Sequence, residues 1–340
     1  MIRPFTIHAG THKTASTYIQ SRLWRNREIL SKYGIRLLYP ENAKTGQFVD
    51  FADWIRERNF SEIKNQLSKV STQDQHIIVS AEQFTKSLTD KTRVEELEIF
   101  LQSQGFKLNI AIFLRDQPDY INSIYVQEVR RFYHSQNIPE FERKCRKKRA
   151  NRFNYYQMFS HLVDNQQITT NFLPYCTSLG DPFNRLLGSL GENLPEEIEW
   201  ISEKPGKSND QPGIKGVWLA LEVCRRMQQM GVKLKLLKNQ SNYIRKYSIP
   251  LGWSENRYYG LRQKKVEIIR NFYKNDNDSF AQKVWGKKSW AEVYKDLPQQ
   301  KYNVLDESLL TTEELNEMKD LIEQILTDLR EENSHAFPMQ

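Results

Sequence analysis

Residues 5–20 read Phe5-Thr6-Ile7-His8-Ala9-Gly10-Thr11-His12-Lys13-Thr14-Ala15-Ser16-Thr17-Tyr18-Ile19-Gln20. The stretch begins as a short apolar run, which is the pattern of a buried strand. Small and hydroxylated residues around one lysine follow, and an amphipathic segment then runs from Tyr18 to Lys32. A strand, a small-residue loop and a helix in this order predict a phosphate site. Several backbone N–H groups and the positive end of the helix dipole can then face one anion.

Side chains in the loop strengthen this prediction. Lys13 adds a mobile positive charge, and the hydroxyl groups of Thr14, Ser16 and Thr17 add hydrogen-bond donors. The common phosphate-loop pattern, G-x-x-x-x-G-K-[ST], is not satisfied, because Ile7 and His12 occupy its two glycine positions. The alternative interpretation is a helix start rich in Ser and Thr that caps only itself.

Further apolar runs extend the pattern of strands along the chain. Short strands are expected at residues 35–39, 76–80, 107–114 and 167–175, with helical segments between them. Helices are expected over residues 16–33 and 257–272 among others. Alternation of this kind predicts an α/β fold with a parallel sheet. Glu82 follows the strand at 76–80, so we expect it at the edge of the sheet where ligands bind in open α/β folds. The alternative for Glu82 is an ordinary acidic residue at a helix start, where the helix dipole favours a negative charge.

The loop resembles a known sequence motif. The run from His12 to Thr17 is similar to the 5′-phosphosulfate loop of sulfotransferases that use 3′-phosphoadenosine-5′-phosphosulfate (PAPS). A second, independent segment resembles the 3′-phosphate motif of the same family: a strand is followed by Arg115, and Ser123 comes eight residues later, on the helix expected to follow that strand. Gln117 between Asp116 and Pro118 departs from the Arg-Asp-Pro order of many relatives. A surface salt bridge is the alternative role for Arg115.

This resemblance implies a fold, a domain organisation and an activity. The fold would be a three-layer α/β/α sandwich with a central parallel sheet, a phosphosulfate loop and a helical C-terminal part. Residues 1–290 would form the catalytic domain, and residues 291–340 a helical extension packing on the domain or on a second subunit. The activity would be transfer of a sulfuryl group from PAPS to a hydroxyl or amine of a saccharide, metabolite or peptide.

The resemblance also assigns roles to individual residues. The expected catalytic residues are Lys13, which holds the leaving group, and Glu82, which acts as the base, with His12 as a rival base and His8 as a weaker one. The expected cofactor-binding residues are Thr11, His12, Lys13, Thr14, Ala15, Ser16, Thr17, Arg115 and Ser123. No metal is expected.

Composition adds general constraints. The chain has 340 residues, and Lys and Arg outnumber Asp and Glu by 50 to 42, which gives a net charge of +8. This balance favours anionic partners, such as a nucleotide or an anionic acceptor, without choosing among them. Three widely spaced cysteines and the lack of a long apolar run suggest a reducing compartment and no membrane span, so a complete chain would be cytoplasmic. Nucleic acid is not an expected partner, and the oligomeric state stays open.

Two other functions remain as alternatives. The first is an ATP-dependent P-loop kinase in which Asp116 is a magnesium ligand. The second is a non-enzymatic nucleotide- or nucleic-acid-binding protein that uses the basic run at residues 142–152, although a solvated helix face is the favoured interpretation of that run. Residues 204–213 are rich in turn-forming residues and are interpreted as a connector. The last helix is expected to begin with a capping box formed by Thr311 and Glu314.

Overall fold

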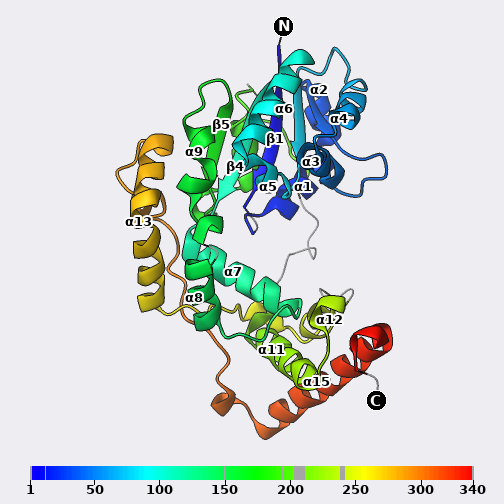
Figure 1. Ribbon diagram of the computed structural model, residues 1–340, viewed down its shortest axis with the longest axis vertical. Helices are drawn as coiled ribbons and strands as arrows, with labels where there is room; N and C mark the ends of the chain where they lie inside the picture. The colour runs from blue at the N-terminus through cyan, green and yellow to red at the C-terminus, as the bar shows by residue number, and fades with distance from the viewer. Residues whose placement is uncertain are drawn as a thin grey trace. The chain divides into compact units, whose positions relative to one another are not determined.

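A computed structural model describes residues 2–11, 13–148, 150–192, 194–202, 211–237 and 242–338 (Figure 1). The chain forms two compact units. Unit 1 comprises Met1–Asp116, Asn151–Lys207 and Tyr273–Pro298, and unit 2 comprises Gln117–Ala150, Ser208–Phe272 and Gln299–Gln340. Of the expected C-terminal extension, residues 299–340 therefore belong to unit 2. The assignment of a catalytic domain to residues 1–290 stays a prediction.

Unit 1 is built around a parallel sheet of five strands in the order β2-β3-β1-β4-β5. The strands are β1 (Arg3–Gly10), β2 (Ile35–Leu38), β3 (His76–Ser80), β4 (Phe106–Leu114) and β5 (Thr169–Pro174). In the centre of the sheet, Phe5 pairs with Ile77 on one side and with Leu108 on the other. The predicted α/β class and parallel sheet are confirmed, because the buried apolar runs do form adjacent strands.

Helices cover both faces of this sheet, which gives the three-layer α/β/α arrangement. On one face, side chains of β2, β3 and β4 share a core with α1 (Ser16–Arg25), α2 (Arg27–Lys32) and α10 (Pro182–Gly188). On the other face, Phe5 stacks on Phe51, and Phe51 contacts Phe84 edge to face. The other helices that lie wholly within unit 1 are α3 (Val49–Glu57), α4 (Phe60–Leu67), α5 (Phe84–Leu88), α6 (Lys91–Ser103), α9 (Tyr155–Val163) and α14 (Trp290–Val293).

Unit 2 consists of helices among its described residues. They are α7 (Gln117–Arg130), α8 (Ile138–Lys148), α11 (Gly213–Gln229), α12 (Tyr243–Ser248) and α15 (Thr312–Glu332). The remaining long helix, α13 (Gln263–Trp285), contains the division between the units. Short 3₁₀ helices occupy Ala150–Arg152, Thr177–Leu179, Leu234–Leu236, Trp253–Glu255, Glu307–Leu309 and Ser334–Ala336.

Two helical segments differ from the sequence prediction. The single helix expected from Ser16 to Tyr33 is interrupted at Asn26, whose side-chain amide donates to the carbonyls of Arg22 at 2.8 Å and Ile201 at 3.0 Å. The helix expected from Arg257 to Phe272 instead runs from Gln263 to Trp285, and it ends at Gly286, where φ is +63°. A glycine with positive φ is a common helix stop.

The last helix has the predicted start. Thr311 and Glu314 form the capping box, with hydrogen bonds of 2.9 and 3.1 Å between the side chain of each and the backbone N–H of the other. The sequence left open what its apolar stripe packs on. In unit 2, α15 packs on α11, and ion pairs join Glu314 to Lys215 at 2.9 Å and Asp328 to Lys246 at 2.9 Å. Its buried residues are Met318, Ile322, Ile325, Leu326 and Leu329.

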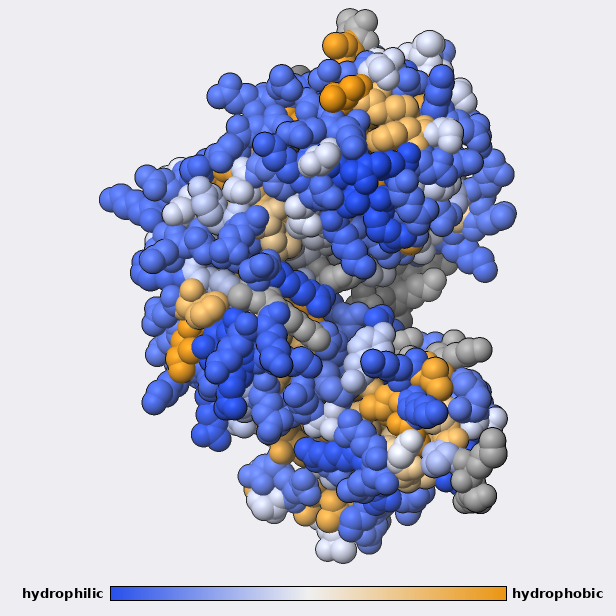
Figure 2. Space-filling view, in the orientation of Figure 1, coloured by the Kyte–Doolittle hydropathy of each residue, from blue (hydrophilic) through white to orange (hydrophobic). Residues whose placement is uncertain are grey.

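The surface is largely polar. The face in Figure 2 is mostly hydrophilic, as a mean hydropathy of −0.71 leads one to expect. Some large apolar side chains are nevertheless exposed, and Leu309 is the most open of those described, at 81%. No helix in the described ranges is both long enough and apolar enough to cross a membrane.

Candidate functional site

The candidate site is the loop between β1 and α1 in unit 1. The strand ends at Gly10, the helix begins at Ser16, and the backbone between them adopts left-handed conformations at Lys13 (φ 72°) and Ala15 (φ 60°). Such conformations cost on the order of 1 kcal/mol for each non-glycine residue and gather at ligand sites. The loop is therefore held in an unusual shape by its surroundings.

Buried hydrogen bonds supply that support. The backbone N–H and the hydroxyl of Thr11 both donate to the carbonyl of Phe113 on β4, at 3.2 and 3.1 Å. The hydroxyl of Thr14 donates to the carbonyl of Thr11 at 2.6 Å, and a Cβ atom at Gly10 would lie only 2.5 Å from that hydroxyl oxygen. Thr11 and Thr14 are predicted phosphate-binding residues whose hydroxyl hydrogens serve the loop itself.

The start of α1 keeps donors for a ligand. The helix has no side-chain cap at Ala15, and its first backbone hydrogen bond runs from the N–H of Ile19 to the carbonyl of Ala15 at 2.9 Å. In the described part of the chain, the backbone N–H groups of Ser16, Thr17 and Tyr18 have no acceptor. These groups lie at the positive end of the helix dipole, where an anion is favoured.

Arg115 meets this loop from the end of β4. Its Nη1 donates to the carbonyl of Lys13 at 3.1 Å, and its guanidinium carbon lies 5.6 Å from the ring centre of Tyr175. The hydroxyl of Tyr155 donates to the carbonyl of Arg115 at 2.7 Å and so fixes its backbone. No carboxylate in the described residues forms an ion pair with Arg115, so the expected alternative of a salt bridge is not seen there. The structure thus brings together two segments that sequence reasoning named separately.

Glu82 reaches the same loop from the end of β3. The hydroxyl of Ser16 donates a hydrogen bond to its Oε1, and the hydroxyl of Thr85 donates to the carbonyl of Gly10 at 2.8 Å. Glu82 is half-buried. Strands β1, β3 and β4 therefore bring Lys13, Glu82 and Arg115 to one edge of the sheet, which is where parallel sheets place their ligands.

His8 lies beneath the loop and differs from the other candidates. It is 1% exposed, its Nδ1 pairs with the hydroxyl of Ser80 at 2.7 Å, and its ring meets Phe113 edge to face. Burial lowers the pKa of His8 to about 4, although the negative charge of Glu82 acts in the opposite direction. His8 is therefore neutral near pH 7 and part of the core. His12, the other rival base, lies outside the described residues, as do residues 204–210 of the expected connector.

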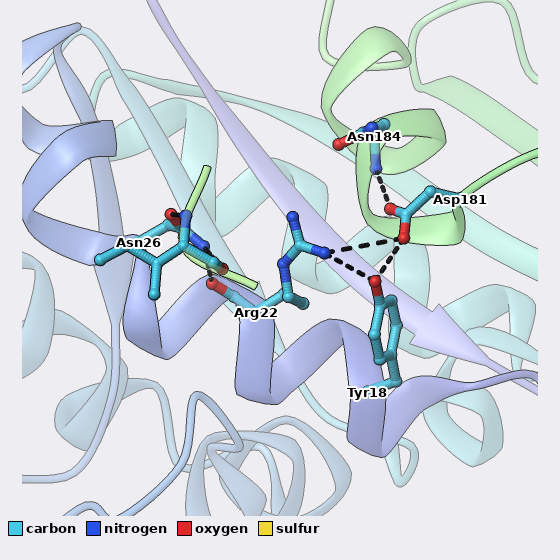
Figure 3. A network of polar contacts seen from close by, with 6 residues as sticks. Tyr18, Arg22, Asn26, Asp181 and Asn184 are labelled. Carbon is cyan, nitrogen blue, oxygen red and sulfur yellow. Dashed lines mark hydrogen bonds and ion pairs between the residues drawn. The ribbon is translucent and has the colours of Figure 1, made fainter. Parts of the chain in front are cut away.

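A polar network that sequence reasoning missed fixes α1 on α10. Figure 3 shows Tyr18 and Arg22 pointing toward Asp181, which caps α10 by accepting from the backbone N–H of Asn184 at 2.9 Å. Tyr18 donates to Asp181, and Arg22 donates to the hydroxyl of Tyr18 at 2.7 Å. The Asp181-Pro182 pair, a typical helix start, was the signal that could have indicated this cap. The network holds the helix that carries the loop.

Ser123 belongs to a different unit from Arg115. It lies in α7 of unit 2, is 6% exposed, and follows Asn122, whose side chain bonds the backbone of Tyr258 and Gly260 at 3.2 and 3.0 Å. The helical placement agrees with the expectation that Ser123 comes round on the helix after Arg115. Joint binding of a phosphate by the two residues stays a prediction.

The basic run falls largely on α8, an amphipathic helix of unit 2. It buries Phe141, Glu142 and Cys145 and exposes Arg143, Lys147 and Lys148. The buried carboxylate of Glu142 pairs with Arg146 and with Lys265, the latter at 3.5 Å. This arrangement agrees with the solvated helix face that the sequence favoured.

Comparison with known proteins gives no further identification. No protein-family model, curated protein or solved structure matches the chain. Over the ranges that the structure describes, no group of three or more His, Cys, Asp and Glu side chains is arranged to hold a metal ion. The resemblance to sulfotransferases and the roles derived from it therefore stay predictions.

Proposed function

We propose that this protein is a PAPS-dependent sulfotransferase. The observation that carries the proposal is the meeting of Lys13, Arg115 and Glu82 around one loop, with the Arg115 guanidinium 3.1 Å from the Lys13 carbonyl and Ser16 hydrogen-bonded to Glu82. The three N–H groups at the start of α1 for which the described residues offer no acceptor suit a phosphate. Two basic side chains beside them suit a ligand with several negative charges, and PAPS carries both its phosphosulfate and a 3′-phosphate.

Each residue of the loop has a role that follows from its position. The N–H groups of Ser16 and Thr17 would hold the 5′-phosphate, while Lys13 would approach the oxygen that links this phosphate to the sulfuryl group. Arg115 has five N–H donors, of which one bond to Lys13 leaves others for the 3′-phosphate. Ser123 would complete that phosphate site as proposed from the sequence motif.

The reaction needs a base and stabilisation of the leaving group. PAPS supplies an activated sulfuryl group. Glu82 would take the proton of the acceptor hydroxyl as its oxygen bonds to sulfur, while the bond from sulfur to the bridging oxygen breaks. Lys13 would stabilise the charge that then collects on the 5′-phosphate of adenosine 3′,5′-bisphosphate. Lys13 should stabilise the transition state more than it stabilises bound PAPS, because this charge grows in the transition state.

The kinase alternative receives less support from the same residues. Asp116, its expected magnesium ligand, is 1% exposed and accepts a hydrogen bond from the indole N–H of Trp290 at 2.9 Å. These contacts are typical of a buried carboxyl group with a structural role, which holds the neighbouring side chain by a hydrogen bond. The non-enzymatic alternative rested on the basic run, and the ion pairs of Glu142 give that helix a structural explanation.

Thermal stabilisation by nucleotides tests the proposal. Adenosine 3′,5′-bisphosphate at 100 times its dissociation constant should stabilise the protein by about 2.7 kcal/mol, and EDTA should not change this. Arg115→Ala should weaken the bisphosphate about 10- to 100-fold, since a charged hydrogen bond contributes about 1.5–3 kcal/mol. It should weaken adenosine 5′-monophosphate much less.

Matched controls separate a nucleotide contact from support of the loop. Lys86→Ala removes an exposed lysine on α5 and should leave both affinities unchanged. Equal weakening of the two nucleotides by Arg115→Ala would mean that Arg115 only supports Lys13. Stabilisation by ATP with magnesium, without any response to the bisphosphate, would favour the kinase.

A further inference from the structure

The outer side of α8 in unit 2 carries positive charge that the ion pairs of this helix do not explain. Arg143, Lys147 and Lys148 are exposed, and Lys144 is half-buried. In the part of the chain that the structure describes, none of these four side chains forms an ion pair. Of the two acids on the helix, one is fully buried, and Glu140 is the exposed one. The outer side of α8 is therefore strongly basic.

The start of α13 lies against α8 and extends this basic surface. Lys265 pairs with the buried Glu142 at 3.5 Å, and the guanidinium carbon of Arg146 lies 5.8 Å from the ring centre of Phe272. Both contacts join the same two helices within unit 2. Together, α8 and residues 257–272 contain ten Lys and Arg residues against three acidic ones. The positive charge is therefore concentrated on one pair of packed helices.

Two exposed aromatic rings border this surface. Phe272 is 51% exposed beside the guanidinium of α8, and Tyr302 is 47% exposed. The guanidinium carbon of Arg262 lies 4.8 Å from the ring centre of Tyr302. The carbonyl of Arg262 accepts from the backbone N–H of Lys265 at 2.8 Å, so this arginine lies one turn before the lysine that contacts α8. From Arg262 to Phe272 the chain rises about 15 Å along α13, and each end of this stretch presents an exposed ring beside a guanidinium group.

The combination of charge and rings depends on the fold. The basic run at residues 142–152 contains no aromatic residue of its own, and the sequence did not lead us to expect nucleic acid. The structure brings Phe272 beside this run, and Tyr302 beside the residues of α13 that continue its charge. Proteins that bind single strands combine basic side chains that follow the phosphate backbone with aromatic rings on which bases stack.

We propose that the surface formed by α8, residues 257–272 and Tyr302 binds single-stranded nucleic acid. The lysines and arginines would contact backbone phosphates and release the counterions bound to them. Phe272 and Tyr302 would each stack on an unpaired base, and the adjacent guanidinium groups would add charge-assisted contacts to the same nucleotides. The inference does not depend on the proposed sulfotransferase activity.

Two oligomers with the same backbone test the role of the bases. Fluorescence anisotropy is measured with a labelled oligothymidylate of about 12 nucleotides that has no terminal phosphates. An oligomer of equal length in which every base is absent keeps the phosphates and should bind at least about tenfold more weakly, because it cannot stack. Equal binding of the two would show a general polyanion surface and overturn the proposal, as would absence of binding to the oligothymidylate at low salt. This comparison uses the unmodified protein, so it does not depend on the folding of any variant.

Substitutions of aromatic residues assign the binding to this surface. Phe272→Ala and Tyr302→Ala should each weaken oligothymidylate binding about tenfold. Tyr33→Ala is the control, because it removes a ring that is 42% exposed on unit 1, and it should change binding less than twofold. Unchanged binding by both Phe272→Ala and Tyr302→Ala, or equal weakening by Tyr33→Ala, would refute the assignment.

The salt dependence separates phosphate contacts from the effect of net charge. Lys147→Gln combined with Lys148→Gln should lower the slope of log Kd against log salt concentration by about 1.4, since each phosphate contact contributes about 0.7 for single strands. Lys32→Gln combined with Lys319→Gln removes the same charge from exposed positions on α2 and α15 and should leave the slope unchanged. An equal fall for both pairs would contradict a defined site on α8. An oligouridylate of the same length, titrated in parallel, distinguishes RNA from DNA by the tighter binding.

Discussion

The contact between Gly10 and Thr14 allows the architecture of the loop to be tested without any assumption about function. A Cβ atom at position 10 would lie 2.5 Å from the Thr14 hydroxyl oxygen, which is fully buried and bonded to the Thr11 carbonyl. Gly10→Ala must therefore displace this hydroxyl. Overpacking of this kind costs about 1–3 kcal/mol, and loss of the hydrogen bond about 1 kcal/mol more.

A double-mutant cycle isolates this contact. Thr14→Ala alone should cost about 1 kcal/mol, because it removes the hydrogen bond without a clash. The Cβ of Thr14 is 3.8 Å from the carbon added at position 10, so alanines at both positions can coexist. The double variant should consequently be about as stable as Thr14→Ala alone, which corresponds to a coupling energy of about 2–4 kcal/mol.

Urea unfolding followed by circular dichroism measures the four free energies of unfolding. Gly188→Ala is the matched control, since apart from its chain neighbours and its own helix backbone no described atom lies within 4 Å of the added carbon at the end of α10, and its stability should be unchanged or slightly higher. Additive losses in the double variant would refute the reasoning. So would a Gly10→Ala variant as stable as the wild type.

Three further predictions concern the core, the chemistry and the last helix. Burial lowers the pKa of His8 to about 4 from its ordinary 6.5, so the unfolded chain binds a proton first and stability falls as pH drops from 6.5 to 4. His8→Gln should reduce this loss in the free energy of unfolding between pH 6.5 and pH 4 by about 3 kcal/mol, as measured by urea unfolding. An unchanged pH dependence would contradict the prediction. Glu82→Gln should keep nucleotide affinity while lowering single-turnover sulfate transfer by about 10²–10⁴-fold, and full activity would exclude Glu82 as the base. Ile325→Ala should cost about 2–5 kcal/mol because the side chain is fully buried in unit 2, whereas exposed Leu309→Ala should cost less than about 0.5 kcal/mol; similar losses would contradict the packing.

The fold could largely be predicted from the sequence because its signals are local. Runs such as Ile77-Ile78-Val79 are buried on both faces of the sheet, so they are apolar throughout and easily recognised. The capping box of Thr311 and Glu314 lies within a single turn of helix. The break at Asn26, in contrast, depends on the backbone of Ile201, which is 175 positions away. No local pattern predicts such a partner.

The site was predictable in its members but not in their contacts. Lys13, Glu82 and Arg115 were named from short motifs and their places at strand ends, and these three lie around one loop. The hydroxyl of Thr14 was expected to face a phosphate and instead bonds the Thr11 carbonyl. A sequence shows which donors exist, but the nearest acceptor depends on backbone angles such as the left-handed turn at Lys13.

Asn26 has a consequence for how freely the chain can vary. Its amide N–H donates to the Ile201 carbonyl at 3.0 Å, and its amide oxygen accepts from the Ile201 N–H at 2.7 Å, in the manner of a neighbouring strand. The side chain of Ile201 takes no part in either bond and is 48% exposed. Position 201 can therefore accept most residues other than proline, while position 26 tolerates almost none, because only asparagine offers both a donor and an acceptor at that length. Anchoring through the backbone places the whole sequence requirement on one partner of the pair.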